Sequence, residues 1–148
     1  MNAFIKSCLA SFLFLISFAA FAASPIGYWK TIDDVTGRPK GIVKISGSPS
    51  NLHATVVKIF PGGLTVCTAC HGSLKNKPIM GMTVMSGLKQ EANNSNTWSG
   101  GRILDPKNGK EYNCKLTVSD DGSRLDVRGF MGISLFGRTQ TWVRVSGT

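Results

Sequence analysis

The spacing of the apolar residues constrains the fold of this chain more than any other feature of its sequence. After residue 25, no stretch places apolar residues at helical spacing over the length of a helix, whereas short runs rich in β-branched and aromatic residues recur. Gly, Pro, Asn and Asp separate these runs. We therefore expect an all-β fold with eight strands, at residues 27–32, 40–46, 52–59, 83–88, 97–104, 111–119, 124–130 and 139–145.

The connections between these strands are mostly short. "DPKNGK" (105–110) and "SDDGS" (119–123) carry the residues that tight hairpin turns need, so the C-terminal half is expected to form a meander. Eight antiparallel strands can close into a small up-and-down barrel, which leaves no exposed edge and can enclose one small ligand. A β-sandwich is the alternative architecture.

The first residues indicate export. Lys6 precedes an apolar run at residues 9–22, which ends in small residues with Ala20 and Ala22 at the −3 and −1 positions of a cleavage site. We expect residues 1–22 to be a signal peptide and residues 23–148 to form one mature domain, periplasmic or secreted. Cys8 precedes the apolar run, so a lipid anchor is not expected. No second apolar stretch is long enough to span a membrane.

The chain is basic, with a formal net charge of +9 that falls to about +8 when Lys6 leaves with the signal peptide. The lysines are scattered, which is typical of a solubilising surface and also permits anionic partners. Nucleic acid is not an expected partner outside the cytoplasm, and the mature chain is expected to be a monomer.

The string "CTACH" at residues 67–71 matches the attachment signature of a c-type haem. Cys67 and Cys70 would form the thioethers, and His71 would be an axial ligand. Residues that could supply a second axial ligand are His53, Met80, Met82 and Met85. No helical segment stands beside the motif, and a small packed barrel has little room for a macrocycle. We therefore expect no haem and no other cofactor.

The same residues suit three other roles. A C-x-x-C pair can cycle between dithiol and disulfide, but the strand-then-helix context of redox enzymes is missing. Cys67, Cys70 and His71 could hold a metal ion with Cys114 or His53, although a second close pair of ligands is absent. The third role, which we expect, is a structural disulfide between Cys67 and Cys70 that pins the long connection between the third and fourth strands. Cys114 is then a small buried core residue, unless it pairs with one of the loop cysteines.

The last predicted strand has two very different faces. Arg138, Gln140, Trp142 and Arg144 alternate with threonines and valines at positions 139, 141, 143 and 145. If the first face points inward, it is costly to bury without a partner, which makes Arg138, Gln140 and Trp142 a candidate site for a small polar or anionic ligand. If the threonines and valines form the core, these three residues face solvent. The sequence leaves both arrangements open.

Other functional signals are weak. The acidic residues of the mature chain stand mostly in or beside predicted turns, and no Ser or Cys nucleophile motif accompanies His53. No Gly-rich phosphate loop follows a strand and opens a helix. The apolar segment "MGISLFG" (131–137) is expected to form a packed corner, with a barrel lid or a membrane-touching loop as alternatives.

Motifs that extend over nearly the whole mature chain carry a family resemblance. They are "GYWKTIDDVTGRPKGIVKI" (27–45), "CTAC" (67–70), "KNKPIMGM" (75–82), "WSGGRILDPKNGKEYNCKL" (98–116) and "VRGFMGISLFGRTQTWVRV" (127–145). Together they resemble the bacterial exported domain-of-unknown-function family 2147 (DUF2147). The resemblance implies a lipocalin-like barrel and no particular activity. In lipocalins a Gly-x-Trp on the first strand closes the barrel floor under an Arg from the last strand, and the matching residues are Trp29 and Arg144.

The sequence therefore predicts an exported, lipocalin-like β-barrel of about eight antiparallel strands. Its expected role is to bind a small molecule or to associate with the cell envelope, without catalysing a reaction. The alternatives are a thiol redox, metal or haem protein that uses the CTACH motif, and a structural or protein-interaction role in the periplasm.

Overall fold

The computed structural model describes residues 23–148, so the predicted signal peptide at residues 1–22 lies outside the described residues. As predicted, the described chain is almost entirely β. Its elements are β1 (Gly27–Ile32), β2 (Pro39–Ser48), β3 (Asn51–Ile59), the short 3-10 helix η1 (Gly72–Leu74), β4 (Thr83–Glu91), β5 (Asn94–Asp105), β6 (Lys110–Val118), β7 (Arg124–Phe130), the short 3-10 helix η2 (Ser134–Phe136) and β8 (Gly137–Val145).

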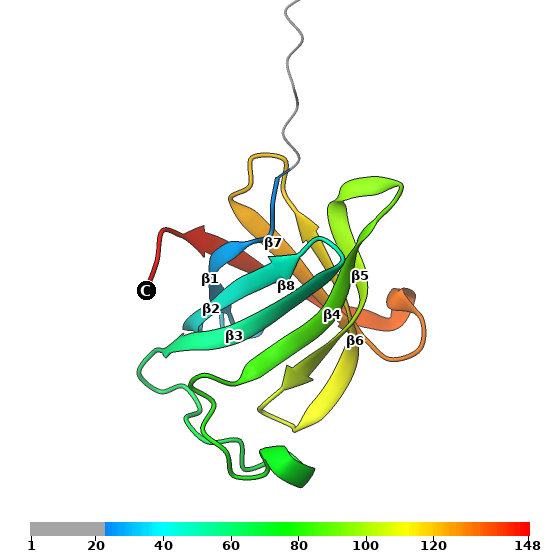
Figure 1. Cartoon of the computed structure of the whole chain (residues 1–148). Helices are drawn as coiled ribbons and strands as arrows, with labels where there is room; N and C mark the ends of the chain where they lie inside the picture. Colours follow the sequence, from blue (N-terminus) through cyan, green and yellow to red (C-terminus); the bar gives the residue numbers. More distant parts are fainter. Residues whose placement is uncertain (1–22) are drawn as a thin grey trace, which may run out of the picture.

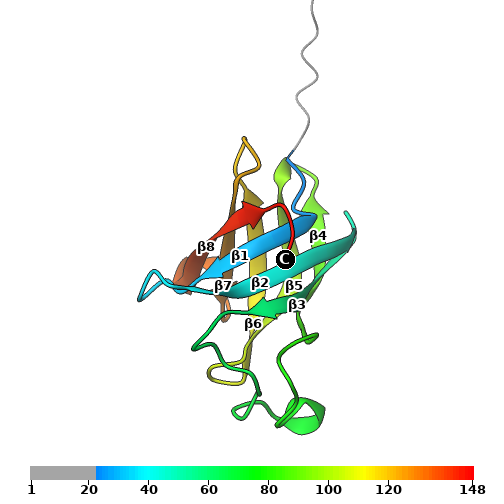
Figure 2. The ribbon, with the colours of Figure 1, turned by 90° about the vertical axis from the view of Figure 1, so that its left-hand side faces the viewer.

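The eight strands form one closed antiparallel barrel in which every strand pairs with its neighbours in sequence (Figure 1). Closure comes from β1 and β8, where Trp29 lies opposite Arg144 and Lys30 lies opposite Val143. Figure 2 shows β1 and β8 side by side on the face turned toward the viewer. The alternative of a β-sandwich is therefore wrong, because a sandwich would leave these two edges unpaired.

Up-and-down order gives the barrel two different ends. We call the end that carries the β1–β2, β3–β4, β5–β6 and β7–β8 connections the mouth end, and the opposite end, with the β2–β3, β4–β5 and β6–β7 connections, the floor end. Both views show the long β3–β4 connection pointing away from the end where the β6–β7 turn lies (Figures 1 and 2). Residues 23–26 and 146–148 leave the barrel at the floor end, because β1 starts and β8 ends there.

The floor half of the barrel is filled by its own side chains. Trp29, Ile45, Leu88, Leu116 and Leu125 come from five different strands and have no exposed surface. Burial of such apolar area is the main stabilising contribution to a small domain. A solid floor leaves only the mouth half of the interior for another molecule.

The predicted boundaries between the fourth and fifth strands were wrong. The sequence predicted that the fourth strand ends at residue 88 and that the fifth begins at residue 97, but β4 and β5 continue until Glu91 pairs with Asn94. Polar residues dominate this stretch and suggested a loop. In the structure their backbones complete a hairpin, since a strand at the rim of a barrel needs no apolar face.

No helix among residues 23–148 is long and apolar enough to cross a membrane.

Candidate functional site

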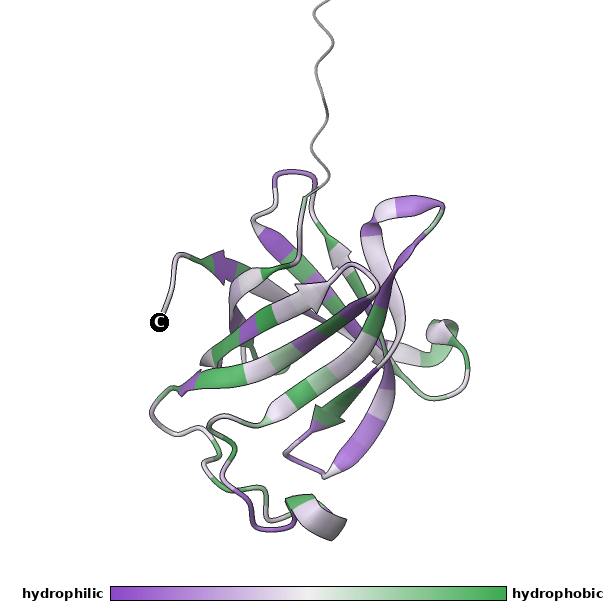
Figure 3. Cartoon of the chain, in the orientation of Figure 1, coloured by the Kyte–Doolittle hydropathy of each residue, from purple (hydrophilic) through white to green (hydrophobic). Residues whose placement is uncertain are grey.

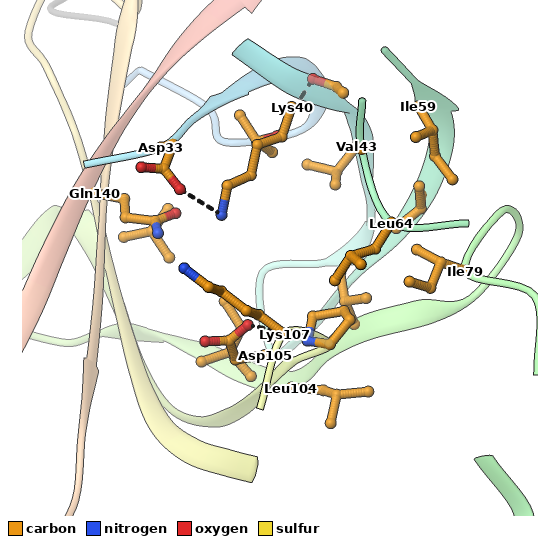
Figure 4. A pocket seen from close by; sticks show the side chains of 18 of the residues that line it. Asp33, Lys40, Val43, Ile59, Leu64, Ile79, Leu104, Asp105, Lys107 and Gln140 are labelled. Atoms are coloured by element: carbon orange, nitrogen blue, oxygen red, sulfur yellow. Dashed lines mark hydrogen bonds and ion pairs between the residues drawn. The ribbon is translucent and has the colours of Figure 1, made fainter. Parts of the chain in front are cut away.

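A cavity of about 510 Å³ opens at the mouth end of the barrel. Much of its wall is apolar and is formed by side chains from six strands and the β3–β4 connection. These residues include Val43, Val56, Ile79, Val84, Leu104, Val127 and Trp142. The charged groups stand in or next to the mouth-end connections, and Figure 4 shows Asp33, Lys40, Asp105 and Lys107 together on one side of the cavity. The volume falls within the range of small-molecule sites, and the apolar wall with few polar groups is typical of them.

The inward face of β8 links the rim to the bottom of the cavity. Trp142 is buried, whereas Thr141 and Val143 on the neighbouring positions are exposed. Arg138, Gln140 and Trp142 all line the cavity. Of the two arrangements left open by the sequence, β8 adopts the one with Arg138, Gln140 and Trp142 on its inward face. The alternative, in which the threonines and valines of β8 form the core, is wrong.

These inward polar groups are paired by a residue from a distant turn. Asp34, in the β1–β2 connection, forms an ion pair with Arg138 and accepts hydrogen bonds at Oδ1 from Arg138 Nη2 at 2.9 Å and from Gln140 Nε2 at 3.3 Å. Gln140 Oε1 in turn accepts a hydrogen bond from Trp142 Nε1 at 3.2 Å. The cost of placing this column at the cavity wall is thereby offset without a ligand.

A second acidic residue of the same turn is also satisfied. Asp33 Oδ1 accepts hydrogen bonds from the Thr36 backbone nitrogen at 2.8 Å and from its hydroxyl at 3.1 Å, and Asp33 Oδ2 lies 3.0 Å from Lys40 Nζ. The backbone donor of Thr36 and the ammonium of Lys40 hold the pKa of the Asp33 carboxyl well below its usual value. Asp33 therefore carries its charge at any physiological pH and neutralises Lys40.

Burial and pairing act against each other at Asp34. Partial burial on its own would raise the pKa of the Asp34 carboxyl, but the hydrogen bonds from Arg138 outweigh it and the pKa is lowered. The same pairing raises the pKa of Arg138. The Asp34–Arg138 pair thus stays fully charged and is internally neutral.

Lys107 differs from the other cations of the rim. Its backbone nitrogen donates to Asp105 Oδ1 at 2.9 Å, but its amino group forms no ion pair within the described chain. Lys58 also borders the cavity, but its amino group lies over the Phe60 ring, 6.0 Å from the ring centroid. In Figure 4 the side chains of Lys107 and Lys40 reach toward the same central space. Lys40 is neutralised by Asp33, so Lys107 and Lys58 are the cavity lysines without an ion pair within residues 23–148, and of these two only Lys107 also has no aromatic ring beneath its amino group.

Sequence reasoning missed Lys107, Lys40 and both aspartates of the β1–β2 turn. Each stands in or beside a turn, where the sequence pattern indicates only a cap or a solvated charge. The turn signals were correct, since Asp33 and Asp105 do accept hydrogen bonds from their own turns. Nothing in the local sequence tells which turns meet around one opening.

Trp29 and Arg144 lie together at the floor end, away from the cavity. The guanidinium of Arg144 stacks on the Trp29 ring with its carbon 4.2 Å from the ring centroid, and the Trp29 indole nitrogen donates to Pro25 O at 2.7 Å. Neither residue lines the cavity. Their geometry is that of a plug and not of a binding site.

Cys67 and Cys70 are joined by a disulfide and are both buried, in agreement with the expected structural bond. Both sulfurs are thus used, and neither is available for a haem thioether or a metal ion. The bond lies in the β3–β4 connection, where the isolated bridge between Val66 and Pro78 also holds the two halves of the connection together. Cys67 Sγ lies 3.7 Å from Pro106 O, so the pinned connection rests on the β5–β6 turn beside the cavity.

The remaining metal and haem candidates are dispersed. Cys114 is a free, buried thiol on β6, as expected for a core residue, and does not pair with the loop cysteines. His71 is exposed in the β3–β4 connection, and His53 is exposed on β3. No group of three or more His, Cys, Asp or Glu side chains within residues 23–148 is placed to hold a metal ion.

The connection between β7 and β8 is not the packed corner that the sequence predicted. Met131, Ile133, Leu135 and Phe136 are 57%, 60%, 76% and 76% exposed. None of them lines the cavity, so the segment is not a lid in this structure either. Four large apolar side chains are left facing outward beside the mouth.

Comparison with solved structures supports the architecture. Protein HP1028 of Helicobacter pylori, described as belonging to the lipocalin family, superposes with a TM-score of 0.72 at 18% sequence identity. The match covers 84% of this chain and 84% of that chain. At this identity the likeness concerns the fold alone, which is lipocalin-like as expected. No curated protein matches this chain in sequence.

The sequence family agrees with the one that the motifs resemble. A family model described as "Uncharacterized protein conserved in bacteria (DUF2147)" matches residues 27–144, which extend from the first residue of β1 to the penultimate residue of β8. The chain belongs to this bacterial family, DUF2147.

Proposed function

We propose that this protein binds a small amphipathic molecule with an anionic group in the mouth half of its barrel. The observation that carries the proposal is the combination of an apolar cavity of about 510 Å³ with one rim cation, Lys107, that has neither an acidic nor an aromatic partner. An apolar body would contact Val43, Val127 and Trp142, and the anionic group would meet Lys107. Burial of apolar area supplies affinity, and the charge supplies orientation.

This proposal narrows the ligand expected for Arg138, Gln140 and Trp142 from any small polar or anionic molecule to an amphipathic one with an anionic group. Arg138 is neutralised by Asp34, so it offers the ligand a paired guanidinium and not a free charge. The Gln140 amide already donates a hydrogen bond to Asp34 and accepts one from the Trp142 indole. These three residues shape the cavity, and Lys107 distinguishes an anionic ligand from a neutral one.

Two further parts of the proposal rest on the sequence. The pattern at residues 1–22 supports export, and export to an oxidising compartment agrees with a structural disulfide between Cys67 and Cys70. We propose a binding role and no catalysis, because Asp33 and Asp34 are held in ion pairs and Asp105 accepts a hydrogen bond from the backbone of its own turn.

A matched pair of fluorescent probes tests this function. Anilinonaphthalene sulfonate and N-phenyl-1-naphthylamine share the same apolar rings, but only the first carries an anionic sulfonate. We expect saturable binding of both probes at one site. Lys107→Gln should weaken the sulfonate probe about tenfold, as expected for a hydrogen bond to a charged group. It should leave the neutral probe nearly unchanged.

Lys115→Gln is the matched control, because Lys115 lies outside the cavity on β6 and pairs with Glu91 at 3.5 Å. This variant should bind both probes as the unaltered protein does. An equal loss of both probes on Lys107→Gln would show that the charge does not orient a ligand. Absence of saturable binding of either probe would overturn the proposed function as a whole.

A further inference from the structure

The backbone of the exposed apolar segment between β7 and β8 is held by several hydrogen bonds. Arg128 projects from β7 beneath it and donates from Nε to Ser134 O at 2.7 Å and from Nη2 to Leu135 O at 3.2 Å. Its Nη1 donates to Thr139 Oγ1 at 2.8 Å, and the Phe136 nitrogen donates to Ile133 O at 3.2 Å. The carbonyls of Ile133, Ser134 and Leu135 are therefore engaged while the apolar side chains are exposed. We call Met131, Ile133, Leu135 and Phe136 the apolar tip.

These hydrogen bonds lower the free-energy cost of moving the segment from water into an apolar phase. A segment that enters an apolar phase loses the hydration of its carbonyl groups, and each unsatisfied group is expensive. The guanidinium of Arg128 already supplies donors to two of these carbonyls. A tip that enters an apolar phase would keep these donors and so lose less than a tip whose carbonyls are bonded only to water.

Exposed apolar side chains are concentrated at one end of the barrel. Among residues 23–148, ten large apolar side chains are exposed, and eight of them lie in the mouth-end connections: Val35, Leu64, Val66, Met80, Met131, Ile133, Leu135 and Phe136. The other two are Ile26, in the segment before β1 at the floor end, and Val143 on the barrel wall, and the floor-end connections contain none of the ten. Figure 3 shows this contrast, with the β4–β5 and β6–β7 connections coloured as hydrophilic.

Charge follows the same division. The mouth-end connections carry four cations, namely Arg38, Lys75, Lys77 and Lys107, and two acidic residues, Asp33 and Asp34, which are both in ion pairs. The floor-end connections carry Asp120 and Asp121 and no cation. The mouth end is thus both the apolar end and the cationic end of the molecule.

We propose that the mouth end docks on the surface of an anionic phospholipid bilayer, with the apolar tip inserted among the lipid headgroups. Apolar side chains flanked by Lys and Arg are the combination that binds such surfaces, since insertion and attraction to anionic lipid add together. The apolar side chains stand on three separate connections, two of which also carry cations, and Lys107 lies on the fourth. This mixture of apolar and cationic side chains complements a bilayer surface of apolar and anionic groups. Docking through the mouth end would turn the opening of the cavity toward the bilayer.

Flotation with lipid vesicles tests the proposal directly. The unaltered mature protein should float with vesicles of phosphatidylcholine and phosphatidylglycerol, and it should float poorly with pure phosphatidylcholine or in high salt. The double variant Leu135→Ser, Phe136→Ser should bind the anionic vesicles at least about tenfold more weakly, because two apolar side chains are lost from the contact. Its thermal unfolding should match that of the unaltered protein.

Val143→Ser is the matched control, because Val143 is an exposed apolar residue on the barrel wall, 39% exposed, and lies outside the mouth-end connections. It should leave vesicle binding unchanged. A second variant, Phe136→Trp, should show fluorescence quenching by brominated lipid beyond that of the three native tryptophans, which are all buried. The proposal is overturned if the unaltered protein does not float with anionic vesicles. It is equally overturned if Val143→Ser loses as much vesicle binding as the double variant. Absence of quenching of the new tryptophan would also overturn it, because that result is expected if the apolar tip binds a protein and not a bilayer.

Discussion

At the scale of single residues, Arg144 shows how one side chain can close a barrel. Its guanidinium stacks on Trp29 and donates to Gly122 O at 2.6 Å and to Ile26 O at 2.9 Å, with a further hydrogen bond to Ser24 O. The carbonyls belong to two separate segments that border the floor. Burial lowers the pKa of Arg144 from its ordinary value, but an arginine remains charged.

Replacement of Arg144 by lysine should therefore destabilise the protein although it preserves the charge. A lysine ammonium lacks the planar fork that bonds several carbonyls and stacks on an indole at once. We expect Arg144→Lys to lower the free energy of unfolding by about 1–3 kcal/mol, as judged by urea denaturation. Arg124→Lys is the control, because the Arg124 guanidinium makes no hydrogen bond within the described chain. Equal stability of both variants would contradict the role of Arg144 as a plug.

At the scale of strands and turns, the sequence predicted the elements better than their partners. The hairpins at 105–110 and 119–123 form where their Asp, Pro and Gly residues indicate them, because turn chemistry is local. The β4–β5 hairpin extends further than predicted, because the polar residues at its end pair through their backbones. The orientation of β8 was undecided because its partner Asp34 lies more than a hundred residues away in sequence. Local sequence patterns carry no information about contacts between residues so far apart in the chain.

The contact between two connections depends on one glycine. Gly109, in the β5–β6 turn, has a φ of +70°, and a Cβ atom at this position would lie 1.9 Å from Ala69 O. Ala69 stands between the two bonded cysteines. The turn that carries Lys107 can therefore pack against the disulfide only if residue 109 has no side chain.

Gly109→Ala should cost more stability than alanine at a comparable glycine. Gly37 is the control, since it has the same φ of +70° in the β1–β2 turn, but a Cβ atom there would meet no other atom within 4 Å. Both variants should lose about 1 kcal/mol to backbone strain. Only Gly109→Ala should in addition displace the β3–β4 connection and increase proteolysis between residues 60 and 82. Similar proteolysis of both variants would show that the two connections do not support each other.

At the scale of the whole molecule, the closed sheet makes Cys114 a reporter of global unfolding. Cys114 lies inside the barrel on β6, and burial raises the pKa of its thiol to about 12. A thiol reacts as thiolate, so both burial and this pKa suppress alkylation in the folded state. Each barrel strand is paired on both sides, which leaves no frayed edge through which a reagent can reach it.

We therefore expect Cys114 to be alkylated only through global opening of the barrel. In the unreduced mature protein, iodoacetamide should add one label per chain in denaturant and none in buffer, as read by intact mass. The rate of labelling at intermediate urea should follow the unfolding equilibrium measured by circular dichroism. Rapid labelling in buffer would indicate local opening of β6, which is inconsistent with a continuous barrel.

The position of the chain ends also determines how the molecule can be handled. Residues 146–148 leave the barrel beside the start of β1, on the side opposite the cavity. A tag or a covalent tether placed after Thr148 would therefore hold the protein with its opening turned outward. Immobilised in this orientation on a sensor surface, every copy would present the cavity and the apolar tip to the passing solution, and the attachment itself would obstruct neither.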